Sequence, residues 1–315
     1  MAAALALAEH GRGLTAPNPA VGCVIVQGGE VVGQGWTQPG GRPHAEAVAL
    51  QQAGEAARDA IVYVTLEPCA HVSSRGPACA ILLADARPAK VVIGVGDPDA
   101  RTNGHGIERL DMAGIEVISG VLREQAERSM AGFFSRIRLG RPYVTLKLAM
   151  SIDGRIALAS GESKWITGEA AREDVHRERA RADMILVGRG TYEADKPSLD
   201  VRIKGLEHAS PRKALLTTGG PVEGFTRLSS PQAIRTLTDI NDLLVEGGAE
   251  TAAAFLGADL VDRLLIYRAP ILLGEGKAAV AGIGLDALAD AHGRWTLMET
   301  RQLGSDTLQV YERVR

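Results

Sequence analysis

Three residues whose side chains bind zinc well follow one another in the first third of the chain: His44, Cys69 and Cys79. One imidazole and two thiolates supply the three protein ligands of a catalytic zinc site, which keeps its fourth position open for water. Glu46 stands two residues after His44, where a carboxylate can move protons near the metal without binding it. A His-x-Glu element followed by Pro-Cys and a further cysteine is typical of zinc-dependent nucleobase deamination. The spacing therefore predicts one catalytic zinc ion per chain and a hydrolytic deamination with Glu46 as the proton shuttle.

The same residues leave other interpretations open. A closed structural zinc site would need a fourth ligand. His71 is the only close candidate, and the chain would then be a non-catalytic, zinc-stabilised binding protein. Nine residues separate the two cysteines, where the simplest deaminase pattern has two. This polar loop, residues 70–78, carries His71 and Arg75, so we expect it to contact an anionic part of a substrate. Cys23 falls in an apolar run and is interpreted as a core residue.

The predicted elements of the first 140 residues place the zinc set at their ends. Residues 44–54 have helical spacing with a glycine stop, and residues 78–86 form a second helix that includes Cys79. Cys69 ends the apolar strand 60–69, and a nearby helix N-terminus favours a thiolate. The other predicted elements are an N-terminal helix ending at Gly11, a hairpin about Gly28–Gly29, a strand over 90–99, and a helix and strand within 106–120. Strands that alternate with helices predict an α/β fold.

A charged segment, residues 121–143, predicts one helix that Gly140 and Pro142 end. We place a domain boundary there, which gives domains of residues 1–140 and 141–315. A chain of 315 residues is longer than one hydrophobic core usually serves, which also indicates two domains. The stretch 203–235 is weakly patterned and predicts no element. The second domain is predicted to contain a strand over 143–151, a helix over 167–183, a strand over 184–188, a strand and helix within 242–257, and late strands over 263–274 and 306–314.

Two strand-to-helix turns in the second domain carry glycine pairs. Gly188 and Gly190 follow one strand, and Gly247 and Gly248 follow another. Backbone N–H groups at such a helix start bind phosphate well, so the two turns indicate an anionic cofactor. No G-x-G-x-x-G motif opens a strand–helix–strand unit in this domain, and a Rossmann cofactor site is therefore not indicated.

Composition narrows the class of protein. Hydrophobic residues make up 45% of the chain and charged residues 23%, which is ordinary for a soluble globular protein. The net charge of −3 and the 4% of aromatic residues argue against a nucleic-acid surface. No apolar run reaches the length of a membrane span, and the apolar start lacks the basic region of a signal peptide. Three cysteines do not suggest a disulfide framework, so we expect a cytoplasmic enzyme.

Longer segments are similar to a known family. In the first half they are PNPAVGCVIV, PHAEAVAL, TLEPCAH and GIERLDMAGIEV; in the second half they are GRPYVTLKLAMSIDGRIALASGESKWIT, ADKPSLDVR and LVEGGAETAAAFL. Together they resemble the bifunctional riboflavin-biosynthesis deaminase/reductase family over nearly the whole chain. The resemblance implies a cytidine-deaminase-like three-layer domain followed by a dihydrofolate-reductase-like domain. It also implies deamination of 2,5-diamino-6-ribosylamino-4(3H)-pyrimidinone 5′-phosphate, then NADPH-dependent reduction of the ribosyl group to a ribityl chain.

The resemblance also assigns residues by position. His44, Cys69 and Cys79 match the zinc ligands, and Glu46 matches the proton donor. The positions that match NADPH contacts are Ala149, Trp165, Thr191, Asp195, Gly248, Ala249, Glu250, Thr251, Ala252, Ala253 and Ala254. The positions that match substrate contacts are Ser163, Arg179, Leu199, Arg202 and Glu246. Two arginines suit a 5′-phosphate, although without the resemblance Arg179 would be interpreted as part of a solvated helix face.

The chain departs from the family in three places. The loop between the cysteines is one residue longer, Lys196 stands where an acidic or amide residue is common, and residues 203–235 are abbreviated. One alternative is therefore an enzyme in which only the deaminase half is active. Another is a nucleic-acid deaminase such as a tRNA adenosine deaminase, against which the acidic net charge and the second domain argue. We expect a small phosphorylated pyrimidine as the substrate, no nucleic-acid or membrane partner, and a homo-oligomer, a dimer.

Overall fold

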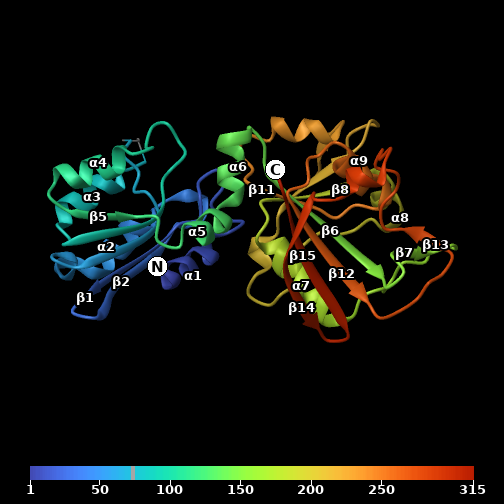
Figure 1. The fold of residues 1–315 in the computed structure, drawn as a ribbon, viewed down its shortest axis with the longest axis horizontal. Coiled ribbons are helices and arrows are strands. Elements are labelled where there is room, and N and C mark those ends of the chain that lie inside the picture. Colours follow the sequence, from blue (N-terminus) through green and yellow to red (C-terminus); the bar gives the residue numbers. More distant parts are fainter. Residues whose placement is uncertain (72–74) are drawn as a thin grey trace. The chain divides into compact units, whose positions relative to one another are not determined.

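The computed structural model describes residues 1–71 and 75–315; residues 72–74, part of the predicted substrate-contacting loop, lie outside the described residues. The chain divides into two compact units, Met1–Gly140 and Arg141–Arg315, coloured from blue to green and from yellow-green to red in Figure 1. Each unit has its own sheet and its own hydrophobic core.

The sheet of the first unit contains β1 (Gly22–Gln27), β2 (Glu30–Trp36), β3 (Ile61–Leu66), β4 (Lys90–Val95) and β5 (Glu116–Ser119). The strand order is β2-β1-β3-β4-β5. β1 pairs antiparallel with β2 and β3, whereas β3, β4 and β5 run parallel. Parallel strands covered on both faces are usually continuous apolar runs, and β3 and β4 consist mainly of valine, isoleucine and leucine.

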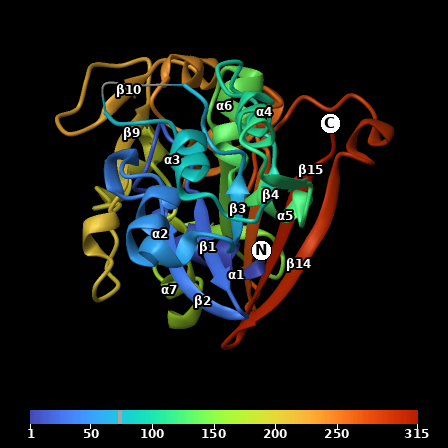
Figure 2. The same cartoon turned by 90° about the vertical axis from the view of Figure 1, so that its left-hand side faces the viewer.

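Helices cover both faces of this sheet: α1 (Ala2–Ala8), α2 (Ala45–Ala53), α3 (Cys79–Ala86), α4 (His105–Met112), α5 (Arg123–Ser129) and α6 (Ala131–Leu139). α2, α3 and α4 pack in a row, and α1 and α5 contact each other, which gives the three layers that Figure 2 shows from the side. Two glycines of β2 let α2 approach closely. A Cβ atom on Gly33 would lie 2.3 Å from the Ala49 carbonyl oxygen, and one on Gly35 would lie 2.6 Å from that of Ala45. This contact fixes the helix start that carries Glu46.

The main sheet of the second unit contains β6 (Tyr143–Ser151), β8 (Met184–Gly188), β9 (Arg212–Leu216), β10 (Thr226–Leu228), β11 (Asp242–Val245), β12 (Arg263–Ala269), β14 (Trp295–Leu303) and β15 (Asp306–Arg313). The strand order is β10-β9-β8-β11-β6-β12-β15-β14. The first six strands in this order run parallel, and β15 and β14 complete the sheet antiparallel. A separate two-stranded ribbon pairs β7 (Arg155–Leu158) with β13 (Gly276–Ala278).

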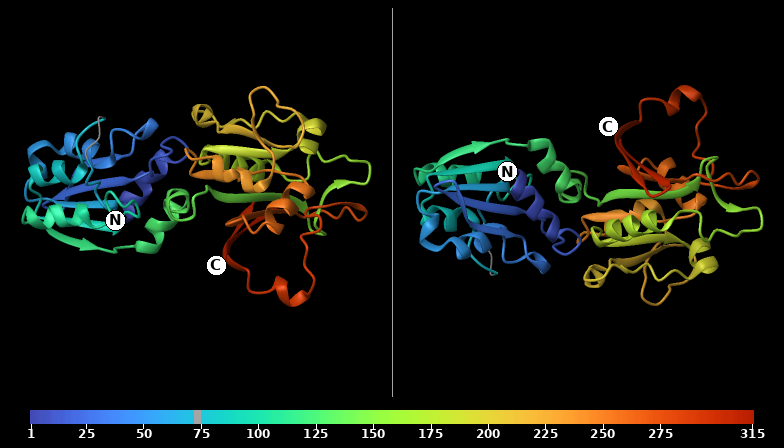
Figure 3. Two further views of the ribbon diagram at one scale, coloured as in Figure 1. Left: turned by 90° about the horizontal axis from the view of Figure 1, so that it is seen from above. Right: turned by 90° about the horizontal axis from the view of Figure 1, so that it is seen from below.

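The helices of the second unit are α7 (Glu169–Ala180), α8 (Arg189–Asp195) and α9 (Ala249–Gly257). Successive residues of β12 show which face α7 and α9 cover. Leu264 belongs to the core cluster that contains Phe255 of α9, and Leu265 belongs to the cluster that contains Ala171 of α7. Neighbouring strand residues point to opposite faces, so α7 and α9 cover opposite faces of the sheet (Figure 3).

Several predicted boundaries are wrong. The single helix predicted over 121–143 is two helices, because Met130 leaves the helical region with φ −117°. The stretch 203–235, for which no element was predicted, contains β9 and β10, and β12 ends at Ala269 rather than continuing to residue 274. The sequence also did not predict β14, whose side chains are mostly exposed and therefore show little apolar alternation.

Candidate functional site

The fold brings the three predicted zinc ligands together in the first unit. His44 immediately precedes α2, Cys69 follows β3, and Cys79 is the first residue of α3. Their ligand atoms all lie within 4.8 Å of one another. The Nδ1 atom of His44 lies 3.3 Å from the sulfur of Cys79 and 3.6 Å from that of Cys69. One imidazole nitrogen and two sulfurs at these separations fit a zinc ion, which prefers this donor set to hard oxygen ligands.

The two thiols are chemically unequal. The backbone N–H of Cys79 donates a hydrogen bond to the sulfur of Cys69 at 3.3 Å. Hydrogen bonding from the Cys79 side chain, with further bonds from His44 and the Cys79 backbone, lowers the pKa of Cys69 to about 4. The same pairing and its burial raise the pKa of Cys79. Cys69 is therefore held as the thiolate, and a bound cation would deprotonate the second sulfur.

Glu46 lies in the first turn of α2 and is 3% exposed. Burial raises the pKa of this carboxyl group. Its side chain is hydrogen-bonded to that of Cys79 and lies close to His44. A buried carboxyl group with a raised pKa, next to a metal site, is suited to accept and donate a proton during catalysis.

Other polar residues of the first unit have partners of their own. The side-chain nitrogen of Asn18 donates to the Gly41 carbonyl at 2.7 Å and lies 3.5 Å from Nε2 of His44, so it orients the imidazole from the far side. Nδ1 of His71 lies 3.4 Å from the hydroxyl of Thr102. Among the described residues the metal-binding cluster contains three members and does not include His71.

Glu67 directly follows β3 and is 3% exposed. One carboxylate oxygen accepts backbone N–H groups from Asp97 at 3.2 Å and Gly104 at 3.1 Å. The other accepts those of Gly106 at 3.0 Å and Ile107 at 3.3 Å. Glu67 therefore ties the segment 97–107, including the start of α4, to the strand that leads to Cys69. The role of Glu67 was not predicted from the sequence, although an acidic residue at the end of a buried strand needs hydrogen-bonding partners.

Asp97 is a second buried carboxyl group near the site that was not predicted from the sequence. It is 7% exposed and lies after β4. Burial raises its pKa to about 7, and the nearby carboxylates of Asp99 and Glu67 contribute to the increase. The sequence signal for this residue is the acidic pair Asp97 and Asp99 in the turn that follows an apolar strand.

In the second unit most of the predicted reductase residues line one cavity of about 1030 Å³. The predicted residues that line it are Ala149, Ser163, Trp165, Arg179, Thr191, Asp195, Leu199, Arg202, Glu246 and Gly248. The remaining ones, Ala249, Glu250, Thr251, Ala252, Ala253 and Ala254, form the first turns of α9 behind Gly248. The structure thus brings together residues from β6, α7, α8 and the start of α9 that are far apart in the sequence.

The floor of this cavity holds a group of charged side chains. Glu246 accepts hydrogen bonds from Nε of Arg179 at 2.7 Å and from its terminal nitrogen at 3.0 Å. The amine of Lys147 lies 3.5 Å from the same carboxylate. Burial alone would raise the pKa of Glu246, but the two cations outweigh it and lower the pKa to about 2. Glu246 is thus a buried anion bonded to two cations, one of which, Lys147, was not predicted from the sequence.

The two glycine turns interlock beside the cavity. The backbone N–H of Gly248 donates to the hydroxyl of Thr191 at 3.1 Å. A Cβ atom on Gly188 would lie 2.0 Å from Oγ1 of Thr251, and one on Gly247 would lie 2.4 Å from its Cβ. Only glycine permits this approach, which puts the N-terminus of α9 at the cavity. A helix N-terminus beside an open cavity suits the phosphates of a dinucleotide, so these residues fit NADPH.

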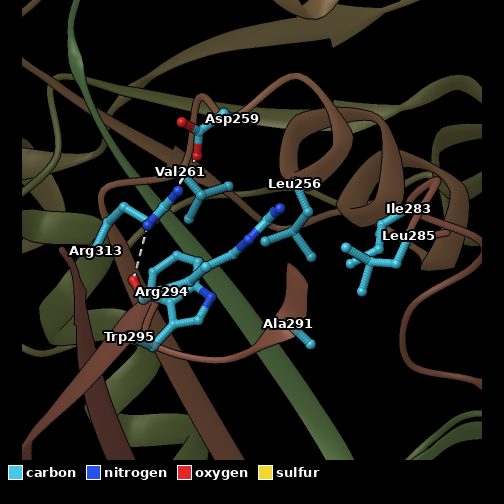
Figure 4. Close-up of a pocket in the computed structure, with 9 residues that line it drawn as sticks. All are labelled: Leu256, Asp259, Val261, Ile283, Leu285, Ala291, Arg294, Trp295 and Arg313. Atoms are coloured by element: carbon cyan, nitrogen blue, oxygen red, sulfur yellow. Dashed lines mark hydrogen bonds and ion pairs between the residues drawn. The ribbon is translucent and has the colours of Figure 1, made fainter. Parts of the chain in front are cut away.

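A second, smaller cavity of about 230 Å³ lies near the end of α9. Figure 4 shows its wall of Leu256, Val261 and Trp295, with Arg313 bonded to Asp259. It contains none of the predicted site residues.

Within the described residues, the structure has no helix whose length and apolar character would allow it to cross a membrane. Comparison with known proteins adds independent evidence. Residues 1–95 match the family described as the cytidine and deoxycytidylate deaminase zinc-binding region, and residues 142–309 match the RibD C-terminal domain. The riboflavin biosynthesis protein RibD of Haemophilus influenzae is 40% identical over 99% of this chain and 96% of its own.

Two solved structures are similar over the whole chain. Acinetobacter baumannii RibD is 36% identical with a TM-score of 0.89, and the match covers 100% of this chain and 98% of the other. A Thermotoga maritima protein is 30% identical with a TM-score of 0.91 over 100% and 97% of the two chains. That protein is described as a diaminohydroxyphosphoribosylaminopyrimidine deaminase/5-amino-6-(5-phosphoribosylamino)uracil reductase.

A cytidine-deaminase-like unit joined to a reductase unit defines a class of bifunctional enzymes with a zinc-binding deaminase half. Within that class, the chain belongs to the RibD family of riboflavin biosynthesis. The predicted fold class, the pairing of a deaminase with a reductase, and the zinc and NADPH cofactors are thereby confirmed.

Proposed function

We propose that Met1–Gly140 deaminates 2,5-diamino-6-ribosylamino-4(3H)-pyrimidinone 5′-phosphate and that Arg141–Arg315 then reduces the ribosyl group to a ribityl chain with NADPH. The deamination step is supported by one observation: one imidazole, two thiols and a buried carboxyl group lie together in one site. The second step is supported by the large cavity with a helix N-terminus and several cations in its wall. The Thermotoga maritima relative is described as carrying the same two activities, a deaminase and a reductase.

In the deaminase unit, His44, Cys69 and Cys79 would hold the zinc ion. When bound, zinc lowers the pKa of water towards neutrality, which makes a nucleophile available at pH 7. Glu46 takes up a proton and delivers it to the pyrimidine, since burial raises the pKa of this carboxyl group and it lies beside the metal ligands. Asn18 keeps the imidazole in place, and Glu67 holds the neighbouring segment.

In the reductase unit, we assign the cofactor-contacting role to Ala149, Trp165, Thr191, Asp195 and the turn Gly248–Ala254. NADPH supplies the hydride when it is bound. Trp165 supports this assignment, because it is 68% exposed and held by the guanidinium of Arg172 at 4.9 Å from its ring. An exposed indole held in this way offers a flat surface for a ligand ring.

The substrate-contacting role falls to Ser163, Arg179, Leu199, Arg202 and Glu246. The two arginines differ in what they can offer an anion. Arg179 is already neutralised by Glu246, whereas Arg202 has a more distant contact, 3.6 Å from Asp200, and its side chain is 59% exposed. Arg202 is therefore the better candidate for the 5′-phosphate, and the Arg179–Glu246 pair is better suited to hydroxyl groups of the sugar.

We further propose that the enzyme is a cytoplasmic homodimer. β14 supports self-association, because it is the edge strand of the eight-stranded sheet and exposes Leu297 and Met298. An exposed edge strand with apolar side chains is a template for pairing with a second chain. Sedimentation of the purified chain tests this: a monomer at micromolar concentration would overturn it.

One experiment tests the assignment of both units. Purified protein should contain about one zinc ion per chain, convert the phosphorylated diaminopyrimidine without NADPH, and consume NADPH only after that conversion. Cys69→Ser should lose the zinc and the deaminase activity, because a hydroxyl group is a poor substitute for a thiolate ligand. The variant should still reduce the pre-deaminated compound. Full zinc content in Cys69→Ser would refute the ligand assignment, and turnover of tRNA in place of the nucleotide would favour the alternative deaminase.

A further inference from the structure

The β7–β13 ribbon forms one wall of the reductase cavity. Ile156, Ala157 and Leu158 of β7 line the cavity, and so do Gly276 and Lys277 of β13. The two strands are more than a hundred residues apart in the sequence, and no hairpin turn joins them. Figure 1 shows the ribbon at the edge of the second unit, beyond the end of β6. A two-stranded sheet is marginally stable alone, so something else must hold it against the cavity.

Asp153 supplies part of that attachment, beside two backbone hydrogen bonds at 2.9 Å, from Ile152 N–H to the Ile271 carbonyl and from Ala279 N–H to the Gly154 carbonyl. It lies in the turn between β6 and β7, and its carboxylate accepts backbone N–H groups from the β12–β13 loop, from Leu273 at 3.2 Å and from Gly274 at 2.8 Å. It also accepts the hydroxyl of Ser151 at 2.6 Å. Hydrogen bonding from Ser151, Leu273 and Gly274 lowers the pKa of Asp153 to about 2, so the carboxylate is charged at neutral pH. One exposed side chain thus ties together the two segments that lead into the ribbon.

The ribbon brings a positive charge to this wall. Four lysines line the cavity: Lys147, Lys164, Lys196 and Lys277. Lys147 lies 3.5 Å from Glu246, and Lys164 lies 3.6 Å from Asp195. Within the described parts of the chain, Lys196 and Lys277 have no anionic partner. A cavity that receives ligands with several phosphate charges needs cations that are not already neutralised.

We propose that Asp153 is a positioning residue of the reductase, which holds the β7–β13 ribbon in place so that Lys277 binds a phosphate group of the ligand in the cavity. The inference rests on the proposed reductase function. The phosphate belongs either to NADPH or to the 5′-phosphate of the sugar substrate. Both have the same chemistry, and titration of each ligand separately distinguishes them.

Two variants of exposed residues test the proposal in the full chain. Asp153→Asn keeps one acceptor oxygen for Ser151 and Leu273 but turns an N–H donor towards the N–H of Gly274. Hydrogen exchange of peptides that cover residues 270–280, measured without ligand, should become at least several-fold faster. Lys277→Met should leave this exchange unchanged. Asp286→Asn and Lys204→Met, which alter exposed residues outside the cavity lining, are the matched controls and should behave as wild type.

Binding and kinetics supply the second measurement. Both variants should bind the phosphate-bearing ligand roughly 10-fold more weakly, as expected for the loss of a charge-assisted contact. The effect should fall on the Kd of NADPH or on the KM of the sugar phosphate, with kcat and the deaminase rate within about twofold of wild type. Raising the salt concentration should reduce the difference between wild type and Lys277→Met.

Three outcomes would overturn the proposal. Unchanged exchange at residues 270–280 in Asp153→Asn would mean that the carboxylate does not hold the ribbon. Unchanged NADPH affinity and unchanged KM in Lys277→Met would mean that the ribbon binds no phosphate, and a loss confined to kcat would place the ribbon in the chemical step. Failure of the proposed function is distinguishable, because wild type itself would then neither bind NADPH nor reduce the sugar.

Discussion

Replacing Glu67 with glutamine tests how the deaminase unit holds its zinc site. In the structure the buried carboxylate accepts four backbone N–H groups, two on each oxygen, from the segment 97–107. Glutamine has the same shape but only one acceptor oxygen. Its amide nitrogen would face two N–H donors, so two of the four bonds are lost, and one buried and one part-buried donor lose their partner.

The size of the effect follows from those two bonds. A hydrogen bond to a charged group contributes about 1.5–3 kcal/mol, so Glu67→Gln should lower the unfolding free energy of the first unit by about 3–6 kcal/mol. Folded domains have about 5–15 kcal/mol in total. The variant should therefore remain folded at low temperature but unfold and release zinc at a much lower denaturant concentration.

Zinc release during chemical denaturation reports on the first unit alone, since His44, Cys69 and Cys79 all belong to it. Asp111→Asn is the matched control, because Asp111 is an exposed acid on α4, and surface substitutions usually change stability by less than about 0.5 kcal/mol. Reduction of the pre-deaminated substrate should be unaffected in both variants. A zinc-release midpoint for Glu67→Gln that corresponds to less than about 1 kcal/mol would refute the reasoning.

Two further predictions concern the second unit. Arg202→Ala should raise the KM of the phosphorylated sugar about 10- to 150-fold, as expected for the loss of a charge-assisted contact, while NADPH affinity stays the same; weaker NADPH binding with an unchanged KM would move Arg202 to the cofactor site. The second concerns acid stability. Because the pKa of Glu246 is lowered from 4.5 to about 2, its ionisation stabilises the fold above pH 4.5, and this contribution, on the order of 3 kcal/mol, is lost as the pH falls towards 2. Denaturation of wild type and Glu246→Gln should show this slope in wild type alone, and parallel curves would contradict it.

The zinc set was predictable because its information is local. His44 and Glu46 share one helix start, and Cys69 and Cys79 each stand at the end of a predicted element. The side-chain types alone then define the metal. The sequence did not predict the hydrogen bonds of Glu67 that hold the segment beside the zinc site. The partners of Glu67 lie 30 to 40 residues further along the chain, and no periodic pattern links them.

In the second unit, the sequence predicted where the cavity forms but not Lys147 or the β7–β13 ribbon in its wall. Glycine turns indicated a phosphate site near Gly248, and the cavity indeed forms there. Lys147 could not be selected, because it alternates with apolar residues along β6 and only the fold shows that its amine lies beside Glu246. β7 and β13 are four and three residues long, too short for a periodic pattern, and they pair across more than a hundred residues.

The central claim is that a zinc site with Glu46 as the proton carrier performs the deamination, separately from the reductase. The most direct measurement is the deamination rate of Glu46→Gln, together with its zinc content and its reduction of the pre-deaminated substrate. The expected result is about one zinc ion per chain, normal reduction, and deamination slowed by roughly two to four orders of magnitude, the usual contribution of general acid–base catalysis. A near-normal deamination rate in the zinc-loaded variant would contradict the account.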